Sequence, residues 1–154
     1  MDDFVQGFSL RLRHFFSWLW NVEGTSGQRA RGFAVGIFSG CFPFFGLQTL
    51  LALVLASIVR GNHLLAVTGT WISNPFTYIP LYWLNYKVGS LFLGPLATSP
   101  GLVDLNRQEL FAHGWMLSYR LFLGSTLVGL ILGSCIGSVL YFFLKKKHLS
   151  KSRL

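Results

Sequence analysis

Acidic residues are scarce in this sequence. The chain of 154 residues carries five aspartates and glutamates against 13 lysines and arginines, and all five acids lie outside the long apolar runs. General acid–base catalysis needs titratable groups beside the reacting atoms, and a proton relay inside a membrane needs ionisable side chains at depth. The sequence also has no H-E-x-x-H, G-x-S-x-G or phosphate-loop motif. We therefore expect no enzyme.

Cysteine is almost absent as well. The two cysteines, Cys41 and Cys135, lie far apart inside apolar runs, and no C-x-x-C occurs. Such positions are typical of cysteines that act as buried small hydrophobes. A disulfide framework or a metal site would show more cysteines or closer spacing. We therefore expect neither a metal nor a cofactor.

Charged residues of both signs make up only 12% of the chain, and hydrophobic residues make up 52%. A soluble domain carries about 25% charged residues. Residues 32–59 and 121–144 have no charge, and residues 61–99 carry only Lys87. Each run exceeds the roughly 20 residues that span a bilayer. The composition predicts a small, all-α integral membrane protein.

The positive charges lie beside the apolar runs and give a formal net charge of +8. Arg29 and Arg31 precede the first run, and the three lysines 145–147 follow the last one. This placement suits anionic lipid head groups and sets the topology by the positive-inside rule. We expect membrane lipids, anionic ones included, as partners, and no nucleic acid.

The N-terminal segment, residues 4–20, mixes aromatic and aliphatic residues with basic ones. It is too short and too charged to span a bilayer, so it predicts an amphipathic helix in the head-group region. The alternative is a helix that packs on the domain itself. Residues 21–31 read as a polar hinge, broken at Gly24 and Gly27.

Pro43 and Gly46 interrupt the first apolar run, residues 32–59. Proline inside a helix removes a hydrogen bond and clashes with the preceding turn. The two limbs, of about 11 to 14 residues, would each rise only about 16 to 21 Å. A re-entrant hairpin with its tip at these two residues fits, and a single kinked, tilted span is the alternative. Gln48 and Thr49 follow the tip and can meet freed backbone groups or a polar ligand.

The second apolar run, residues 62–89, is interrupted by Asn74-Pro75. A residue before proline is pushed out of the helical region, so a first limb, 64–72, should end before a second limb, 76–93. The Asn74 amide can cap the second limb, and Pro75 suits its first position. The free N–H groups of such a half-helix N-terminus suit an anion.

The two interruptions lie about 32 residues apart and indicate a weak internal repeat. Paired breaks at corresponding positions are typical of a transport site. The helix-breaking residues are Pro43, Gly46, Pro75 and Pro80. The candidate substrate-binding residues are the polar and amphipathic ones around the breaks: Gln48, Thr49, Arg60, Asn62, Trp71, Ser73, Asn74, Thr77, Tyr82, Asn85 and Lys87.

The C-terminal third contains the clearest transmembrane helix, residues 120–144. Residues 94–119 read as a connector with a short surface helix over 104–116. Glycines at every fourth position would let other helices approach closely. They are Gly32, Gly36 and Gly40 in the first run and Gly129, Gly133 and Gly137 in this helix.

Positive residues near both termini place both ends in the cytoplasm, so the number of crossings is even. With one crossing by residues 120–144, one broken run should cross and the other should be re-entrant. We prefer the first run as the re-entrant one, because Arg60 then stays inside. The expected domains are an interfacial helix with its hinge (1–24), a membrane domain (25–145) and a basic cytoplasmic tail (146–154).

Three stretches of the sequence resemble the bacterial membrane family DUF2062. They are an F-x-P-F-x-G-x-Q-T-like stretch at 42–49, an R-x-N turn at 60–62, and a W-I-x-N-P-x-T-x-x-P-x-Y segment at 71–82, which Tyr86-Lys87-Val88-Gly89 follows. The likeness covers roughly residues 25–145. It implies a small bacterial membrane protein, and it transfers no catalytic residue, because the family has no settled activity. Some members look fused to glycosyltransferase domains, which implies envelope or lipid-linked sugar work.

Two functions remain open at this stage. The first is transport or flipping of an anionic, phosphate-bearing lipid or envelope precursor. The second is a non-transporting scaffold or assembly factor whose glycine faces and aromatic residues bind partner helices. A homodimer or a partner membrane protein is expected in either case, in the bacterial cytoplasmic membrane. The Pro-broken segments are similar in style to DedA-type lipid transporters, as an analogy of architecture alone.

Overall fold

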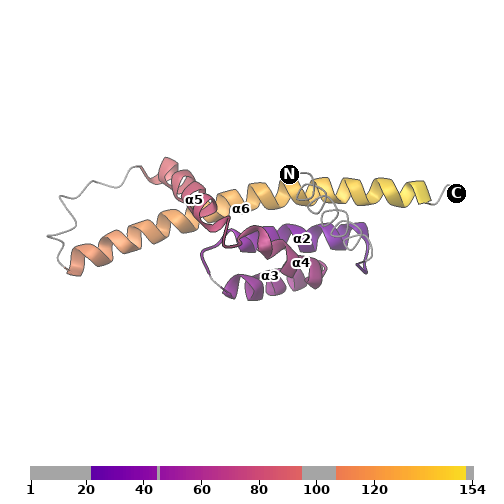
Figure 1. The fold of residues 1–154 in the computed structure, drawn as a ribbon, viewed down its shortest axis with the longest axis horizontal. Coiled ribbons are helices and arrows are strands. Elements are labelled where there is room, and N and C mark those ends of the chain that lie inside the picture. Colours follow the sequence, from indigo (N-terminus) through magenta and orange to yellow (C-terminus); the bar gives the residue numbers. More distant parts are fainter. Residues whose placement is uncertain (1–21, 45, 95–106, 152–154) are drawn as a thin grey trace, which may run out of the picture.

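The computed structural model describes residues 22–44, 46–94 and 107–151, and the segment expected to form an interfacial helix, 4–20, lies outside them. The described residues form helices and no strand, which confirms the all-α prediction. The elements are α2 (Ser26–Gly40), α3 (Leu47–Ile58), α4 (His63–Gly69), the 3-10 turn η1 (Thr70–Ile72), α5 (Tyr78–Leu93) and α6 (Arg107–Lys151) (Figure 1).

Helix α2 begins inside the segment predicted to be a hinge. Thr25 forms a capping box with Gln28: the Thr25 side chain accepts from the Gln28 N–H, and the Gln28 side chain accepts from the Thr25 N–H. Both bonds satisfy N–H groups that the first turn leaves free. Gly27 therefore lies within α2, and only Gly24, with φ of 115°, breaks the chain there.

The first apolar run folds back on itself, as the hairpin interpretation required. Helix α2 ends at Gly40, and α3 begins at Leu47 and packs against α2. Gly46 has a φ of 84°, a left-handed conformation that favours glycine. The apolar contact of the hairpin continues into α4, where Ala52, Ala56 and Ala66 form a buried cluster with Val35 packed against it.

Helix α4 packs parallel to α2 because glycine backbones let the two axes come close. A side chain on Gly32 would collide with the backbone of Asn62, one on Gly36 with Ala66, and one on Gly40 with Thr70. Each pair is 30 residues apart. The glycine stripe of α2 is therefore used inside the chain. The turn before α4 contains Arg60, with φ of 52°, and Asn62, whose side chain caps α4 by accepting from the Leu65 N–H.

The second apolar run is broken where the sequence predicted, but its second helix starts later. Helix α5 begins at Tyr78, not at Pro75, and Thr77 is its N-cap without a side-chain cap bond. Asn74 instead caps the turn before α5, because its Oδ1 accepts from the N–H groups of Phe76 and Thr77. Pro80 lies in the first turn of α5, where its missing N–H costs little.

Helix α6 runs without interruption from Arg107 to Lys151, a length of about 68 Å. The predicted connector helix, transmembrane helix and part of the tail are therefore one element. Proline is absent after Pro100, and lysine is a good helix former, so nothing stops the helix at Tyr119 or at Leu144. The isolated Gly114 is tolerated inside it.

Helix α5 packs antiparallel on the first half of α6. The register follows from three pairs at one-turn intervals: Gly89 meets Arg120, Asn85 meets Gly124, and Leu81 lies in one buried cluster with Val128. The last glycines of α6 face α2 in the same way, since Gly133 and Gly137 lie against Ala34. Figure 1 shows both contacts along α6, with α5 crossing it before α2 does.

The helices give the domain two distinct ends. We call "break end" the residues 41–46 and 73–77 with the adjacent turns of α5 and α6. We call "basic end" the opposite end of the domain, at the start of α2. It carries Arg29 and Arg31 of α2 and Arg60 of the turn before α4.

The two cysteines lie in different environments. Cys41 at the break end is buried, whereas Cys135 is exposed. The prediction that both are buried is wrong for Cys135, because it lies two residues beyond Gly133, on the side of α6 turned away from α2.

Candidate functional site

The surface around the helices is strongly apolar. Residues Gly114–Lys146 of α6 form the one helix, among those described, that is long and apolar enough to cross a membrane, and Leu47–Ile58 and His63–Ile72 are shorter apolar helices. Large apolar side chains stand exposed outside α6 as well, including Phe76 of the second break at 92% and Ile79 of α5 at 81%. Exposed apolar area on this scale marks a surface that another apolar phase covers. Together these features indicate membrane association.

The two breaks touch one another through buried polar groups. The Ser73 hydroxyl donates to Gln48 Oε1 at 3.2 Å, and both side chains are buried. The same hydroxyl also lies 3.1 Å from the Thr70 carbonyl oxygen. Gln48 opens α3 just after the first break, and Ser73 opens the second break. The sequence prediction that these residues share one region therefore agrees with their placement.

A second set of bonds holds the backbone of the second break. Thr77 Oγ1 donates to the Ile72 carbonyl at 2.6 Å and accepts from the Asn74 N–H at 2.8 Å. Asn74 Nδ2 lies 3.5 Å from the Trp71 carbonyl. Asn74 and Thr77 thus act on the backbone of their own loop. The arrangement fixes a non-helical turn between two apolar helices.

Asn85 joins α5 to the end of α2 and to α6. Its side chain is fully buried, and its Nδ2 donates to the Cys41 carbonyl at 2.8 Å and to Ser125 Oγ at 2.9 Å. Its Oδ1 is buried with no hydrogen-bond partner among the described residues. One turn earlier, the Tyr82 hydroxyl lies 3.4 Å from the Phe42 carbonyl. The free carbonyls at the end of α2 are therefore held by α5.

The remaining predicted site residues do not join this cluster. Asn62 lies at the basic end, where its Nδ2 donates to the Glu23 carbonyl at 2.8 Å and its N–H to the Gln28 carbonyl at 2.9 Å. The exposed Arg60 lies there too, and its carbonyl accepts from Arg31 Nη2 at 3.3 Å. One candidate site in the sequence thus corresponds to two places in the fold.

Three other candidates have weaker connections to the break end. Trp71 is 76% exposed, and Thr49 is half-buried on α3. Lys87 is exposed on α5, with its Nζ 5.5 Å from the centre of the Trp83 ring. None of these three shares a hydrogen bond with Gln48 or Ser73 in the described structure.

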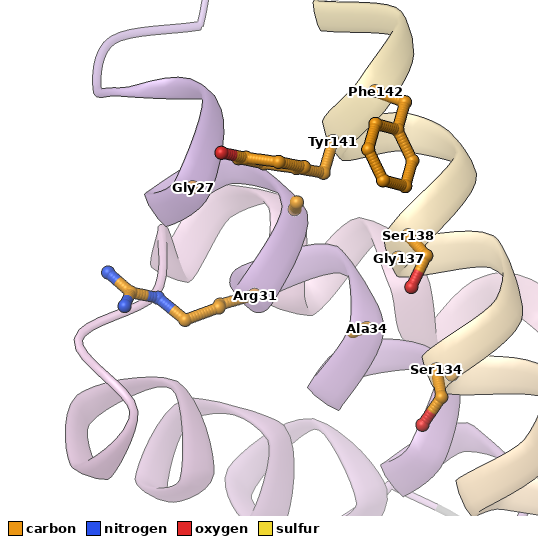
Figure 2. Close-up of a pocket in the computed structure, with 10 residues that line it drawn as sticks. Gly27, Arg31, Ala34, Ser134, Gly137, Ser138, Tyr141 and Phe142 are labelled. Atoms are coloured by element: carbon orange, nitrogen blue, oxygen red, sulfur yellow. The ribbon is translucent and has the colours of Figure 1, made fainter. Parts of the chain in front are cut away.

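An open groove of about 490 Å³ lies between α2 and α6 at the basic end. Figure 2 shows Arg31 projecting from α2, and Ser134, Ser138 and Tyr141 projecting from α6. The Tyr141 ring extends toward the first turn of α2, which contains Gly27. The groove exists because its walls are built largely from glycine, alanine and serine. It adds a basic rim and three hydroxyls to an otherwise apolar surface.

The candidate site predicted from the sequence did not include Arg120. Arg120 is only 2% exposed, and its Nε and Nη1 have no hydrogen-bond partner among the described residues. Ser125 and Ser90 were not singled out either, although the Ser125 hydroxyl bonds Asn85 and the Ser90 hydroxyl is buried without a described partner. The signal available in the sequence was the helical spacing of these residues. That spacing can be interpreted only once the register of α5 on α6 is known.

A group of three or more His, Cys, Asp or Glu residues that could hold a metal does not occur within the described ranges. The groups that do converge are hydroxyls, amides, carbonyls and guanidinium groups. They can bind a polar or anionic molecule through hydrogen bonds.

Comparison with protein families gives one match. The profile of the family described as "uncharacterized protein conserved in bacteria (DUF2062)" matches residues 10–153. The chain belongs to this family. The DUF2062 match extends further toward both termini than the likeness predicted from the sequence motifs, and it includes the whole of α6. No curated protein and no solved structure matches the chain.

Proposed function

We propose that this DUF2062 protein is an integral protein of the bacterial cytoplasmic membrane that moves an anionic, phosphate-bearing lipid between the two leaflets. The observation that carries the proposal is the contact between the two breaks. Two interrupted apolar segments meet through Ser73 and Gln48, and they form a polar spot inside a domain whose surface is apolar. Discontinuous helices that meet inside a membrane domain are the usual frame of a transport site.

The dimensions of α2 support this proposal. Arg31 and Cys41 are ten residues apart, which corresponds to about 15 Å along the helix. If the basic end lies at one membrane surface, the break end would lie about half-way through a hydrocarbon core of about 30 Å. The hairpin of α2 and α3 would then be re-entrant. Irregular backbone at such a depth occurs where it lines a cavity or is covered by protein.

The chemistry of the break end also suits a lipid head group. Apart from Glu23 at the very start, the described residues 22–94 carry no acid, so the polar spot would not repel a phosphate. Its groups are neutral donors and acceptors, which replace water around a head group without holding it too tightly. The groove beside Arg31 supplies a cation at the basic end, where a lipid from the cytoplasmic leaflet would enter.

The scaffold alternative loses its main argument in this fold. It required the glycine faces to bind partner helices, but Gly36 lies against α4 and Gly133 lies against α2 of the same chain. A change at Gly133 would therefore disturb the fold itself. Among the described helices, the glycine stripes are occupied by the chain's own elements.

The proposal is tested with purified protein in liposomes that contain a fluorescent phosphatidylglycerol. Dithionite added outside quenches only the outer leaflet, so the slower phase of quenching reports lipid movement. We expect the parent protein to move labelled lipid from the inner leaflet to the outer one, where dithionite quenches it. Gln48→Leu should slow the movement at least about fivefold, because it removes a polar group worth about 1 kcal/mol to the passing head group.

The matched control is Thr126→Val, which removes a hydroxyl at a similar level of α6. Thr126 Oγ1 donates to the Phe122 carbonyl of its own helix at 2.9 Å, so this variant should move lipid at the parent rate. Lipid movement no faster than in protein-free liposomes would contradict the proposal. So would equal rates in Gln48→Leu and the parent.

A further inference from the structure

We infer that Arg120 is the anion-binding residue of this protein and holds a phosphate group at the α5–α6 crossing, on the far side of the break end from the basic rim. The inference rests on the proposed membrane function and names a site within it. It assigns the phosphate to a residue of α6 that does not belong to the hydrogen-bonded groups of the break end. Four features of Arg120 support this assignment: its burial, its missing hydrogen-bond partners, its depth in the membrane and the direction of its side chain.

The first step is that Arg120 is enclosed. It is 2% exposed, and the helix that covers it is α5, because a side chain on Gly89 would collide with the Arg120 backbone carbonyl. Glycine at that position brings the two helices into contact at the level of Arg120. A guanidinium keeps its charge at any physiological pH. A permanent charge is therefore held between two apolar helices.

The second step is that two nitrogens of the guanidinium have no partner in the described structure. Nε and Nη1 are buried without a hydrogen bond. The nearest acid on α6 is Glu109, 11 residues away and thus about 16 Å along the helix. Residues 24–94, which form every other described helix, carry no aspartate or glutamate. Buried arginines are normally paired with an anion, and here the described residues supply none.

The third step concerns depth. In the α2–α6 register, Arg31 lies opposite residue 136, because Ala34 lies against Gly133 in an antiparallel pair. Arg120 is 16 residues from that level, or about 24 Å along α6. In a core of about 30 Å it would lie within about 6 Å of the opposite surface. Trp115 and Tyr119 are exposed nearby, at 76% and 55%, as aromatics are at a membrane interface.

The fourth step concerns direction. Side chains on a helix lean toward its N-terminus, so the Arg120 side chain extends toward residue 116 and the membrane surface. The facing turn of α5 carries Ser90, whose hydroxyl is also buried without a partner among the described residues. A phosphate oxygen placed between the two helices would accept from the guanidinium and from this hydroxyl. One ligand would thus satisfy two buried groups.

The chemistry required is a phosphate mono- or diester, and it has two sources. A lipid head group reaches this depth with its acyl chains along the exposed apolar faces of α5 and α6. A free phosphate would have to come through the outer interface. The test separates the two by using a short-chain phosphatidylglycerol, the matching diacylglycerol without phosphate, and inorganic phosphate.

The full chain is purified in a zwitterionic detergent, delipidated, and titrated with each ligand while its thermal unfolding is followed. We expect phosphatidylglycerol to raise the unfolding temperature of the parent and diacylglycerol to leave it unchanged. Arg120→Gln should bind phosphatidylglycerol at least about tenfold more weakly, and Ser90→Ala should weaken it by a smaller factor. Lys146→Gln is the matched control: it removes an exposed positive charge of α6 and should bind like the parent.

Two further outcomes decide the source and the inference itself. An equal response to inorganic phosphate assigns the site to free phosphate, and a response to phosphatidylglycerol alone assigns it to lipid. Equal affinity in Arg120→Gln and the parent overturns the inference. If Arg120→Gln does not fold, an equal response of the parent to phosphatidylglycerol and diacylglycerol overturns it as well. These titrations measure binding without movement, so loss of lipid flipping with intact Arg120-dependent binding would contradict only the transport proposal.

Discussion

Gly89 and Gly124 lie where the backbones of α5 and α6 touch. A Cβ on Gly124 would collide with the Asn85 carbonyl oxygen, and one on Gly89 would collide with that of Arg120. These close approaches bring the side chains of Asn85 and Arg120 into the helix interface. At the residue scale, Asn85 and Arg120 can therefore lie in the interface because the residue opposite each of them is a glycine, which has no side chain.

Gly124→Ala should lower the free energy of unfolding by about 3 kcal/mol, because the added methyl group forces α5 and α6 apart. Gly114→Ala makes the same chemical change in the same helix. A Cβ there meets nothing within 4 Å, so this variant should be neutral or stabilised by up to about 1 kcal/mol. Denaturant unfolding of both variants in detergent measures the difference. Equal stability of the two would contradict the register of α5 on α6.

Sequence reasoning at this scale recognised most of the polar residues but not their partners. Gln48, Ser73 and Asn85 stood out because polar residues are costly in an apolar run. Ser125, the partner of Asn85, and the buried Arg120 did not stand out, because both lie on a helix whose rotation about its axis the sequence leaves open. Arg60 and Asn62 were grouped with the breaks, although the length of α4 carries them to the other end of the domain.

The hairpin of α2 and α3 is the element on which the break end depends. Its reversal takes place over residues 41–46, and Phe42 and Phe44 stack at 6.0 Å between ring centres within it. Phe44 also lies 5.2 Å from the Phe122 ring of α6. The tip is therefore anchored on α6 by aromatic contact, and Gly46 provides the left-handed turn into α3.

Gly46→Ala should destabilise the protein by about 1 kcal/mol, because an L-residue is strained at its φ of 84° even though open space surrounds it. Gly27→Ala, which also meets open space but lies within α2, should be neutral or stabilising. Thermal unfolding of the two variants, side by side, tests the turn. A stabilised Gly46→Ala variant would show that the reversal has a different backbone.

The helices before α6 were predictable in number and kind, and less so in their ends. Proline and glycine marked both breaks correctly because their effect on the backbone is local. The start of α5 at Tyr78 depends on the hydrogen bonds of Asn74 and Thr77, which form a separate turn first. The single long α6 was missed because residues 104–116 were predicted as a separate short surface helix, although no proline separates them from residue 120.

Across the whole molecule, α6 connects two packing units. Its first half carries α5 with Asn85 and the crossing at Arg120, and its second half carries α2 with α3 and α4 behind it. The polar groups of the break end lie where these units join, through the bond of Asn85 to the Cys41 carbonyl. Which helices would pair was not predictable, because α2 has small residues on two faces, one for α4 and one for α6.

The central claim is that the break end lies deep in the bilayer, and the depth of Phe76 tests it most directly. Phe76 belongs to the second break and is 92% exposed, so Phe76→Cys can carry a nitroxide without disturbing the core, in a chain whose native cysteines are replaced by alanine. Arg31→Cys at the basic end is the matched control.

Power saturation in reconstituted bilayers, with oxygen and a water-soluble nickel chelate as relaxing agents, gives the depth of each label. We predict that the label at position 76 lies well inside the hydrocarbon, about 15 Å deeper than the label at position 31. A label at position 76 that collides with the nickel chelate as readily as the one at position 31 would contradict the account.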